Sequence, residues 1–153
     1  MQAKNMKLNN TKPGGKVSKN QKIFTLEINP RWDEMDANGH INYMVYLSYF
    51  SEARLMALGQ DVLMNLKKQN IGPFIYRTEV DYKKELRYPE NIFINTWIGE
   101  TIGKTRSIID QEIYTVGSNS LVSKARFYAT FVDLIRRRPV ALPEALIERF
   151  FKQ

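Results

Sequence analysis

One predicted helix organises this chain, and its sequence with flanking residues is Asn42-Tyr43-Met44-Val45-Tyr46-Leu47-Ser48-Tyr49-Phe50-Ser51-Glu52-Ala53-Arg54-Leu55-Met56-Ala57-Leu58-Gly59. Asparagine is a favoured helix N-cap and glycine a common terminator, so we predict a helix over residues 43–58. Its first two turns are apolar almost all round, because Ser48 is the only short polar residue between Tyr43 and Phe50. A helix of this kind is buried on most of its circumference.

The segments around this helix predict a sheet that wraps it. Apolar alternation predicts a strand over residues 22–29, and Pro30 stops it. Residues 31–41 are polar and form a loop, and a second short helix is expected over residues 61–69. The remaining segments are predicted strands at residues 74–84, 91–101, 105–116 and 121–132, and a terminal helix at 143–150. Short turns separate the four strands, which indicates an antiparallel meander. The predicted fold class is α+β, with a curved antiparallel five-stranded sheet around one long central helix.

Length and composition limit the classes of protein and of site. The 153 residues suit one domain, and the absence of cysteine excludes disulfides, thiolate nucleophiles and cysteine-based metal sites. No window approaches the apolar run that a membrane span needs, so we expect no membrane association. One histidine without cysteine is a poor ligand set, so no metal and no cofactor are expected.

The net charge of +7 is concentrated at the N-terminus, where the residues up to Lys22 include six lysines and no acidic residue. We therefore predict a disordered basic tail over residues 1–21 and a folded domain over residues 22–153. The tail could alternatively be attracted to an anionic partner. Nucleic-acid binding is not expected, because the remaining body is nearly neutral. The tail resembles neither a secretory signal nor a transit peptide, which leaves the cytoplasm as the expected location.

Reactive side chains concentrate in Asp36-Ala37-Asn38-Gly39-His40-Ile41-Asn42-Tyr43, immediately before the long helix. A helix start offers unsatisfied N–H groups and a partial positive charge, which can hold an oxygen on which negative charge develops. The carboxylate of Asp36 could activate water or attack directly, Gly39 would allow a sharp turn, and His40 could transfer a proton. Asp, Asn and Gly before a helix are also the residues of an ordinary capped turn, so this alternative remains open.

The segment from Arg31 through Asp36, Asn38, His40 and Tyr43, followed by Tyr46-Leu47 and Glu52-Ala53-Arg54, resembles the hotdog-fold thioesterases. These include 4-hydroxybenzoyl-CoA thioesterases and their acyl-acyl-carrier-protein (acyl-ACP) relatives. The resemblance extends from about residue 23 to the C-terminus and implies a hotdog fold. It implies that Asp36 is the catalytic carboxylate, as nucleophile or general base, with Asn38 and His40 beside it. Gly39, Asn42 and the backbone N–H of Tyr43 would bind substrate and stabilise the oxyanion, although the family often has a second asparagine where Tyr43 stands.

The implied activity is hydrolysis of an acyl-CoA or acyl-ACP thioester to the free acid and thiol. The resemblance also implies a homodimer or homotetramer whose active sites are shared between subunits. Two alternatives stay open at this point: an acyl-binding hotdog protein without catalysis, and a hotdog enoyl hydratase or dehydratase. The hydratase motif usually carries a proline and one more residue between its acid and its histidine, so the spacing from Asp36 to His40 favours hydrolysis.

Overall fold

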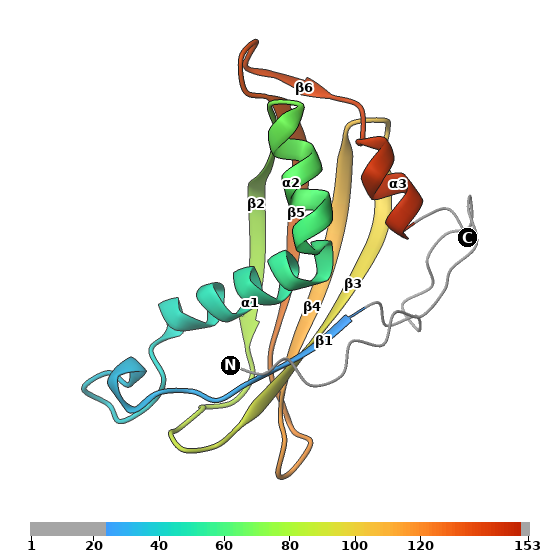
Figure 1. Cartoon of the computed structure of the whole chain (residues 1–153). Coiled ribbons are helices and arrows are strands. Elements are labelled where there is room, and N and C mark those ends of the chain that lie inside the picture. The colour runs from blue at the N-terminus through green and yellow to red at the C-terminus, as the bar shows by residue number, and fades with distance from the viewer. Residues whose placement is uncertain (1–23, 151–153) are drawn as a thin grey trace.

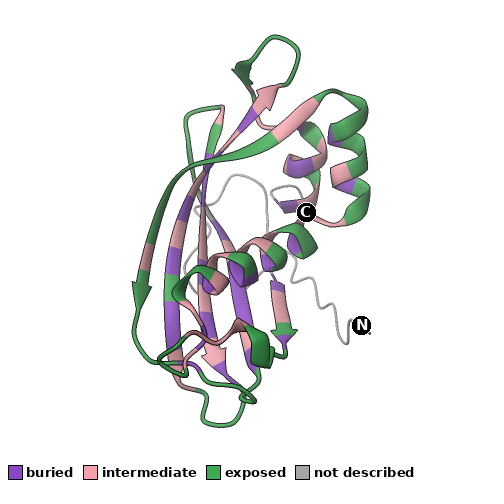
Figure 2. Ribbon diagram, turned by 90° about the vertical axis from the view of Figure 1, so that its left-hand side faces the viewer, coloured by how far each residue is buried: buried purple, intermediate pink, exposed green. Residues whose placement is uncertain are grey.

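The computed structural model describes residues 24–150, apart from the side chains of residues 99 and 100. The predicted basic tail, residues 1–21, lies outside the described residues. Figures 1 and 2 show one antiparallel sheet with the three α-helices on the same face. The elements in chain order are β1 (Phe24–Ile28), the 3-10 turn η1 (Trp32–Glu34), α1 (Tyr43–Leu58), α2 (Gln60–Lys68), β2 (Ile71–Tyr82), β3 (Ile92–Ile102), β4 (Arg106–Thr115), β5 (Leu121–Asp133), β6 (Arg138–Val140) and α3 (Glu144–Phe150). None of these helices is both long and apolar enough to cross a membrane.

The strand order differs from the predicted meander. The sheet runs β1-β3-β4-β5-β2, so β3, β4 and β5 form a meander but β2 lies at the far edge beside β5. The prediction was wrong for β2 because β1 already occupies the free edge of β3, where Leu26 pairs with Ile94. An alternating pattern specifies the two faces of a strand and not its neighbour. A sixth strand, β6, was also not predicted, and its Pro139 is tolerated because β6 lies at a sheet edge opposite Val132.

The core lies between α1 and the concave face of the sheet. Phe50 of α1 is fully buried, and its ring meets that of Phe127 on β5 at a centroid distance of 5.6 Å. Alternate residues of β5 face this core, since Ala125, Phe127, Ala129 and Phe131 are buried. A second cluster joins α2 and α3 to the other end of the sheet and consists of Val62, Leu66, Ile98, Phe131, Leu146 and Phe150.

Helix α1 has the predicted bounds but not the predicted burial. Its buried residues, Tyr46, Tyr49, Phe50, Ala53 and Ala57, share the face toward the sheet. By contrast, Tyr43 is 60% exposed and Met44 55% exposed. The prediction of burial on most of the circumference was wrong for a single chain, because the sheet covers one face only. Large exposed apolar residues on the first turn therefore remain available for a partner.

Both ends of α1 follow from the sequence. The Oδ1 atom of Asn42 accepts a hydrogen bond from the N–H of Met44 at 2.9 Å, which satisfies one N–H group of the first turn. At the other end, Gly59 has φ of +81°, a conformation that favours glycine, and its N–H donates to the carbonyl of Leu55 at 3.1 Å. The predicted helix boundaries are confirmed.

Replacing Asn42 by alanine removes this cap, and the free energy of unfolding is expected to fall by about 1 kcal/mol. Urea denaturation of the two proteins measures the difference. The matched control is Asn42→Ser, since serine can accept the same hydrogen bond and is expected to change stability by only a few tenths of a kcal/mol. Equal stability of wild type and Asn42→Ala would show that the cap contributes nothing.

Candidate active site

The loop before α1 folds back on itself as a tight hairpin. Met35 and Ile41 form an isolated antiparallel bridge, and the N–H of Asp36 donates to the carbonyl of His40 at 2.8 Å. Gly39 closes the turn with φ of +73° and donates to the carbonyl of Asp36 at 3.0 Å. One step nearer the helix, the N–H of Asn42 donates to the carbonyl of Glu34 at 2.9 Å. The hairpin therefore places Asp36 opposite His40, two residues before Asn42, the N-cap of α1.

The Asp36 carboxylate is half-buried and only partly used by the protein. Its Oδ1 atom accepts the N–H of Asn38 at 2.9 Å, which fixes the side chain across the turn. Among the described residues no ion pair and no second hydrogen bond is found for this carboxylate. Its Oδ2 atom can therefore accept from water or approach an electrophile. Asn38 thus contacts Asp36 through its backbone N–H, and Asn38 itself is exposed.

The first turn of α1 leaves one N–H group open. The N–H of Met44 is taken by the side chain of Asn42, and that of Val45 by the Asn42 carbonyl at 2.9 Å. For the N–H of Tyr43 no acceptor is found among the described residues, as expected at the first position of a helix. The carbonyl of Tyr43 accepts from the hydroxyl of Tyr82 at 3.2 Å, so the end of β2 holds the helix opening. An open donor at a helix N-terminus suits a developing oxyanion.

His40 meets two charged residues that follow β2. Its Nε2 atom lies 2.8 Å from Oε2 of Glu85 and 2.9 Å from Nη2 of Arg87. These two contacts require different protonation of the ring, because Glu85 accepts only from Nε2–H whereas Arg87 donates only to an unprotonated Nε2. Arg87 also donates to Glu85 at 3.1 Å, which closes a triangle of charged groups around the ring nitrogen. The imidazole is thereby oriented in both states.

Two further contacts clamp the hairpin to the body of the protein. The N–H of Ile41 donates to the carbonyl of Leu86 at 2.8 Å, and the Leu86 side chain is fully buried. On the other side the hydroxyl of Tyr49, buried on α1, donates to Oε2 of Glu34 at 2.5 Å. Burial, followed by this hydrogen bond to a carboxylate, raises the pKa of Tyr49, so its hydroxyl stays protonated at neutral pH. Sequence reasoning missed Glu34, Glu85 and Leu86, which the fold brings to the loop.

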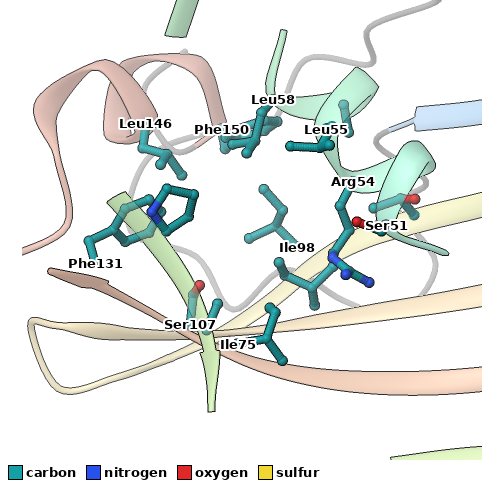
Figure 3. Close-up of a pocket in the computed structure, with 15 residues that line it drawn as sticks. Ser51, Arg54, Leu55, Leu58, Ile75, Ile98, Ser107, Phe131, Leu146 and Phe150 are labelled. Carbon is teal, nitrogen blue, oxygen red and sulfur yellow. The ribbon is translucent and has the colours of Figure 1, made fainter. Parts of the chain in front are cut away.

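A cavity of about 170 Å³ opens between the C-terminal half of α1, the sheet and α3 (Figure 3). Its wall is mostly apolar, and it includes Leu58 from α1, Ile75 from β2, Phe131 from β5 and Leu146 from α3. Within one chain, Asp36 and His40 are not among the lining residues of this cavity. The predicted site residues are thus brought together at one end of α1, and the cavity lies toward the other. Among the side chains that the structure describes, residues 24–98 and 101–150, no group of three or more histidine, cysteine, aspartate or glutamate residues could hold a metal ion.

A family model described as the thioesterase-like superfamily matches residues 30–150 of the chain. The chain belongs to this superfamily. Among curated relatives, the acyl-CoA thioester hydrolase YbgC of Escherichia coli O6:H1 is 24% identical over 136 residues, which are 86% of this chain and 98% of that protein. The matched range includes the whole hairpin from Met35 to Ile41 and all three α-helices.

Solved structures described as thioesterases have the same architecture. Slr0204, a 1,4-dihydroxy-2-naphthoyl-CoA thioesterase from Synechocystis, superposes with a TM-score of 0.75 at 19% identity, covering 82% of this chain and 93% of that one. The DHNA-CoA thioesterase from Staphylococcus aureus gives a TM-score of 0.69 at 27% identity and covers 83% of this chain and 82% of that one. The predicted hotdog fold of this thioesterase-like protein is confirmed.

Proposed function

We propose that this protein hydrolyses an acyl thioester, with an acyl-CoA or acyl-ACP as substrate and the free acid and thiol as products. The observation that carries the proposal is the pairing of a carboxylate that has an open oxygen with an open N–H at a helix start, joined by one tight hairpin. These are the two groups that acyl transfer needs: one to deliver a nucleophile and one to stabilise the oxyanion. The names of the relatives point to the same reaction.

In the proposed reaction the thioester carbonyl oxygen accepts from the N–H of Tyr43. As general base, Asp36 removes a proton from water while the water oxygen bonds to the carbonyl carbon, and the oxyanion forms at the helix opening. The intermediate collapses by breaking the carbon–sulfur bond, and the departing thiolate takes up a proton. As nucleophile, a carboxylate oxygen of Asp36 would instead bond to the carbonyl carbon, the carbon–sulfur bond would break with departure of the thiolate, and water would then hydrolyse the resulting acyl anhydride to the same acid. His40, held by Glu85, is the group available to move protons between these steps.

We further propose that the active unit is a homodimer joined through β2. This strand has twelve residues, pairs with β5 on one side and has no strand on its other edge within the described part of the chain. Several of its large apolar side chains are exposed, with Phe74 at 44% and Tyr76 at 47%. A long apolar edge strand is a template for pairing with another chain, and a second copy of the same strand satisfies it symmetrically.

Such pairing would complete the site. The Tyr82 end of β2 touches the opening of α1, since the rings of Tyr82 and Tyr46 lie 5.3 Å apart, whereas Pro73 and Ile75 near its other end line the cavity. When two copies of β2 pair antiparallel about a two-fold axis, the Tyr82 end of one strand lies beside the Ile71 end of the other. The hairpin of one protomer then approaches the cavity of its partner, where the acyl group would be held.

The proposed activity is tested by the release of free thiol from acyl-CoA substrates with short, medium and long chains, with an aroyl-CoA and acyl-ACP in parallel. The purified full chain is expected to release thiol from at least one of these classes well above the rate without protein. Binding of acyl-CoA without any thiol release would instead identify a non-catalytic acyl-binding protein.

Replacing His40 by alanine is expected to lower kcat about tenfold, less than the loss of roughly 10²-fold or more typical when an essential proton-transfer group is removed. The reason is that Asp36 and the helix opening remain in place when the imidazole is lost. Steady-state thiol release at saturating substrate measures the effect, with Glu85→Gln as the companion variant that keeps the ring but removes the carboxylate beside its Nε2 atom. An unchanged rate in His40→Ala would reduce this histidine to a structural residue.

A further inference from the structure

The cavity beneath α1 contains a cation without a counter-ion. Arg54 lines it, and the one hydrogen bond found for its guanidinium among the described residues goes from Nη1 to Oε1 of Gln111 at 2.9 Å. No described carboxylate lies within ion-pairing distance, and burial alone lowers the pKa of Arg54 to about 10. The guanidinium is therefore still protonated at neutral pH. A charge removed from water without a partner is costly, and an anion inside the cavity would relieve that cost.

Arg54 is held rigidly in this position. Gln111 is fully buried, and its amide nitrogen donates to the carbonyl of Phe50 at 3.1 Å and to the hydroxyl of Thr96 at 2.9 Å. Its amide oxygen is thus fixed toward Arg54. The guanidinium also stacks on the ring of Phe127, with 3.9 Å between its central carbon and the ring centroid. The remaining N–H donors of the Arg54 guanidinium are therefore pre-oriented, which lowers the entropic cost of binding an acceptor.

The cavity has a polar end and an apolar end. Figure 3 shows Arg54 beside Ser51 on one side and Phe131 with Leu146 on the opposite side. Phe150 and Leu58 extend the apolar end. The volume of about 170 Å³ is comparable to cavities of about 150 Å³ that hold a benzene molecule in other proteins, so a body of about six carbons fits. This arrangement matches an amphipathic anion with its head on Arg54 and its chain toward α3.

We infer that the cavity is a binding site for a free carboxylate with an apolar chain of about six carbons, in which Arg54 and Ser51 hold the carboxylate. The inference rests on the proposed function in one respect: thioester hydrolysis releases such an acid at every turnover. Because the acid occupies the space that the acyl chain needs, it acts as a product inhibitor that competes with the acyl-CoA substrate.

The test uses calorimetric titration of the full chain with two probes, hexanoate and hexanol, which share a chain length and differ in charge. We expect hexanoate to bind at least about tenfold more tightly than hexanol, since a hydrogen bond to a charged group contributes on this scale. Arg54→Met is expected to bring hexanoate down to the affinity of hexanol, and Arg54→Lys to retain part of the difference. The matched control is Lys67→Met, which removes an exposed positive charge from α2 and is expected to leave both affinities unchanged.

Equal binding of hexanol and hexanoate to wild type would overturn the inference, and this comparison holds even if Arg54→Met does not fold. Unchanged hexanoate affinity in a folded Arg54→Met protein would overturn it as well. The carboxylate that Arg54 binds could instead belong to the acyl chain of a substrate, and adipoyl-CoA tests this alternative. Selective loss of adipoyl-CoA hydrolysis in Arg54→Met, with no hexanoate binding to wild type, would assign Arg54 to such a substrate carboxylate and overturn the product site. Calorimetry needs no turnover, so hexanoate binding in an inactive protein would refute the proposed hydrolysis alone.

Discussion

The double variant Phe74→Lys/Tyr76→Lys is expected to be monomeric and to lose about 10²-fold in kcat/KM. Both residues lie on the edge strand β2, whose outer edge pairs with no other strand among the described residues, and both are exposed in the single chain. In a two-fold pairing of β2 with its copy, the lysines replace apolar contact area at the free edge of the strand, and charged side chains, lysine above all, oppose pairing of an edge strand with another chain. The loss of activity follows because the hairpin would no longer be held against the partner's cavity, and a misplacement of about 1 Å can cost 10²-fold.

Sedimentation equilibrium gives the mass in solution, and thiol release gives the activity of the same samples. The matched control is Ile102→Lys/Val116→Lys, which adds the same charge at two exposed apolar positions, at the end of β3 and directly after β4, two strands that do not border β2. This control is expected to remain dimeric and active. A monomeric wild type with full activity would contradict the shared site, as would a monomeric double variant that turns over at the wild-type rate.

The helices and strands could largely be predicted from the sequence because their signals are local. Asn42 and Gly59 mark the ends of α1, and period-two alternation marks the strands within three residues or fewer at each end. The neighbour of β2 could not be predicted, because pairing depends on which edge β1 occupies. The burial of α1 was overestimated for a related reason: Tyr43 and Met44 are apolar although no part of the same chain covers them. Their apolar character is consistent with a partner subunit.

For the candidate site, the motif predicted which residues lie together but not what holds them. The placement of Asp36, Gly39 and His40 at the helix opening follows from eight consecutive residues, and the structure brings these three together in one hairpin. Their supports come from distant positions, with Glu85 beside His40 and Gln111 beside Arg54. Contacts over such separations leave no periodic signal in one sequence. One local signal pointed to the segment that supports the hairpin: Leu86 stands between the charged residues Glu85 and Arg87, and an apolar residue in such a stretch indicates that the segment packs against the core.

Replacing Asp36 by asparagine is expected to lower kcat for thioester hydrolysis by about 10² to 10⁴. Asparagine keeps an oxygen that can accept the N–H of Asn38, so the turn from Asp36 to Gly39 is expected to survive. What is lost is the negative charge, and with it both the ability to remove a proton from water and the ability to attack the carbonyl. Because the substrate contacts remain, KM is expected to change little.

The matched control is Asp33→Asn, which removes a carboxylate three residues earlier in the same loop. Asp33 is exposed and pairs with Arg31, away from the hairpin turn. An exposed ion pair contributes little to stability, so this variant is expected to fold and to hydrolyse thioesters at the wild-type rate. It separates the loss of the Asp36 carboxylate from a general effect of lowering the negative charge of the loop.

The role of the Asp36 carboxylate is tested most directly by the maximal rate of thiol release by wild type, Asp33→Asn and Asp36→Asn, measured on the acyl-CoA that wild type hydrolyses fastest. Circular dichroism spectra of the three proteins establish that all are folded. Equal rates are expected for the first two proteins, and a rate lower by at least about a hundredfold is expected for the third. Hydrolysis by Asp36→Asn at the wild-type rate would contradict the role of this carboxylate at the helix opening.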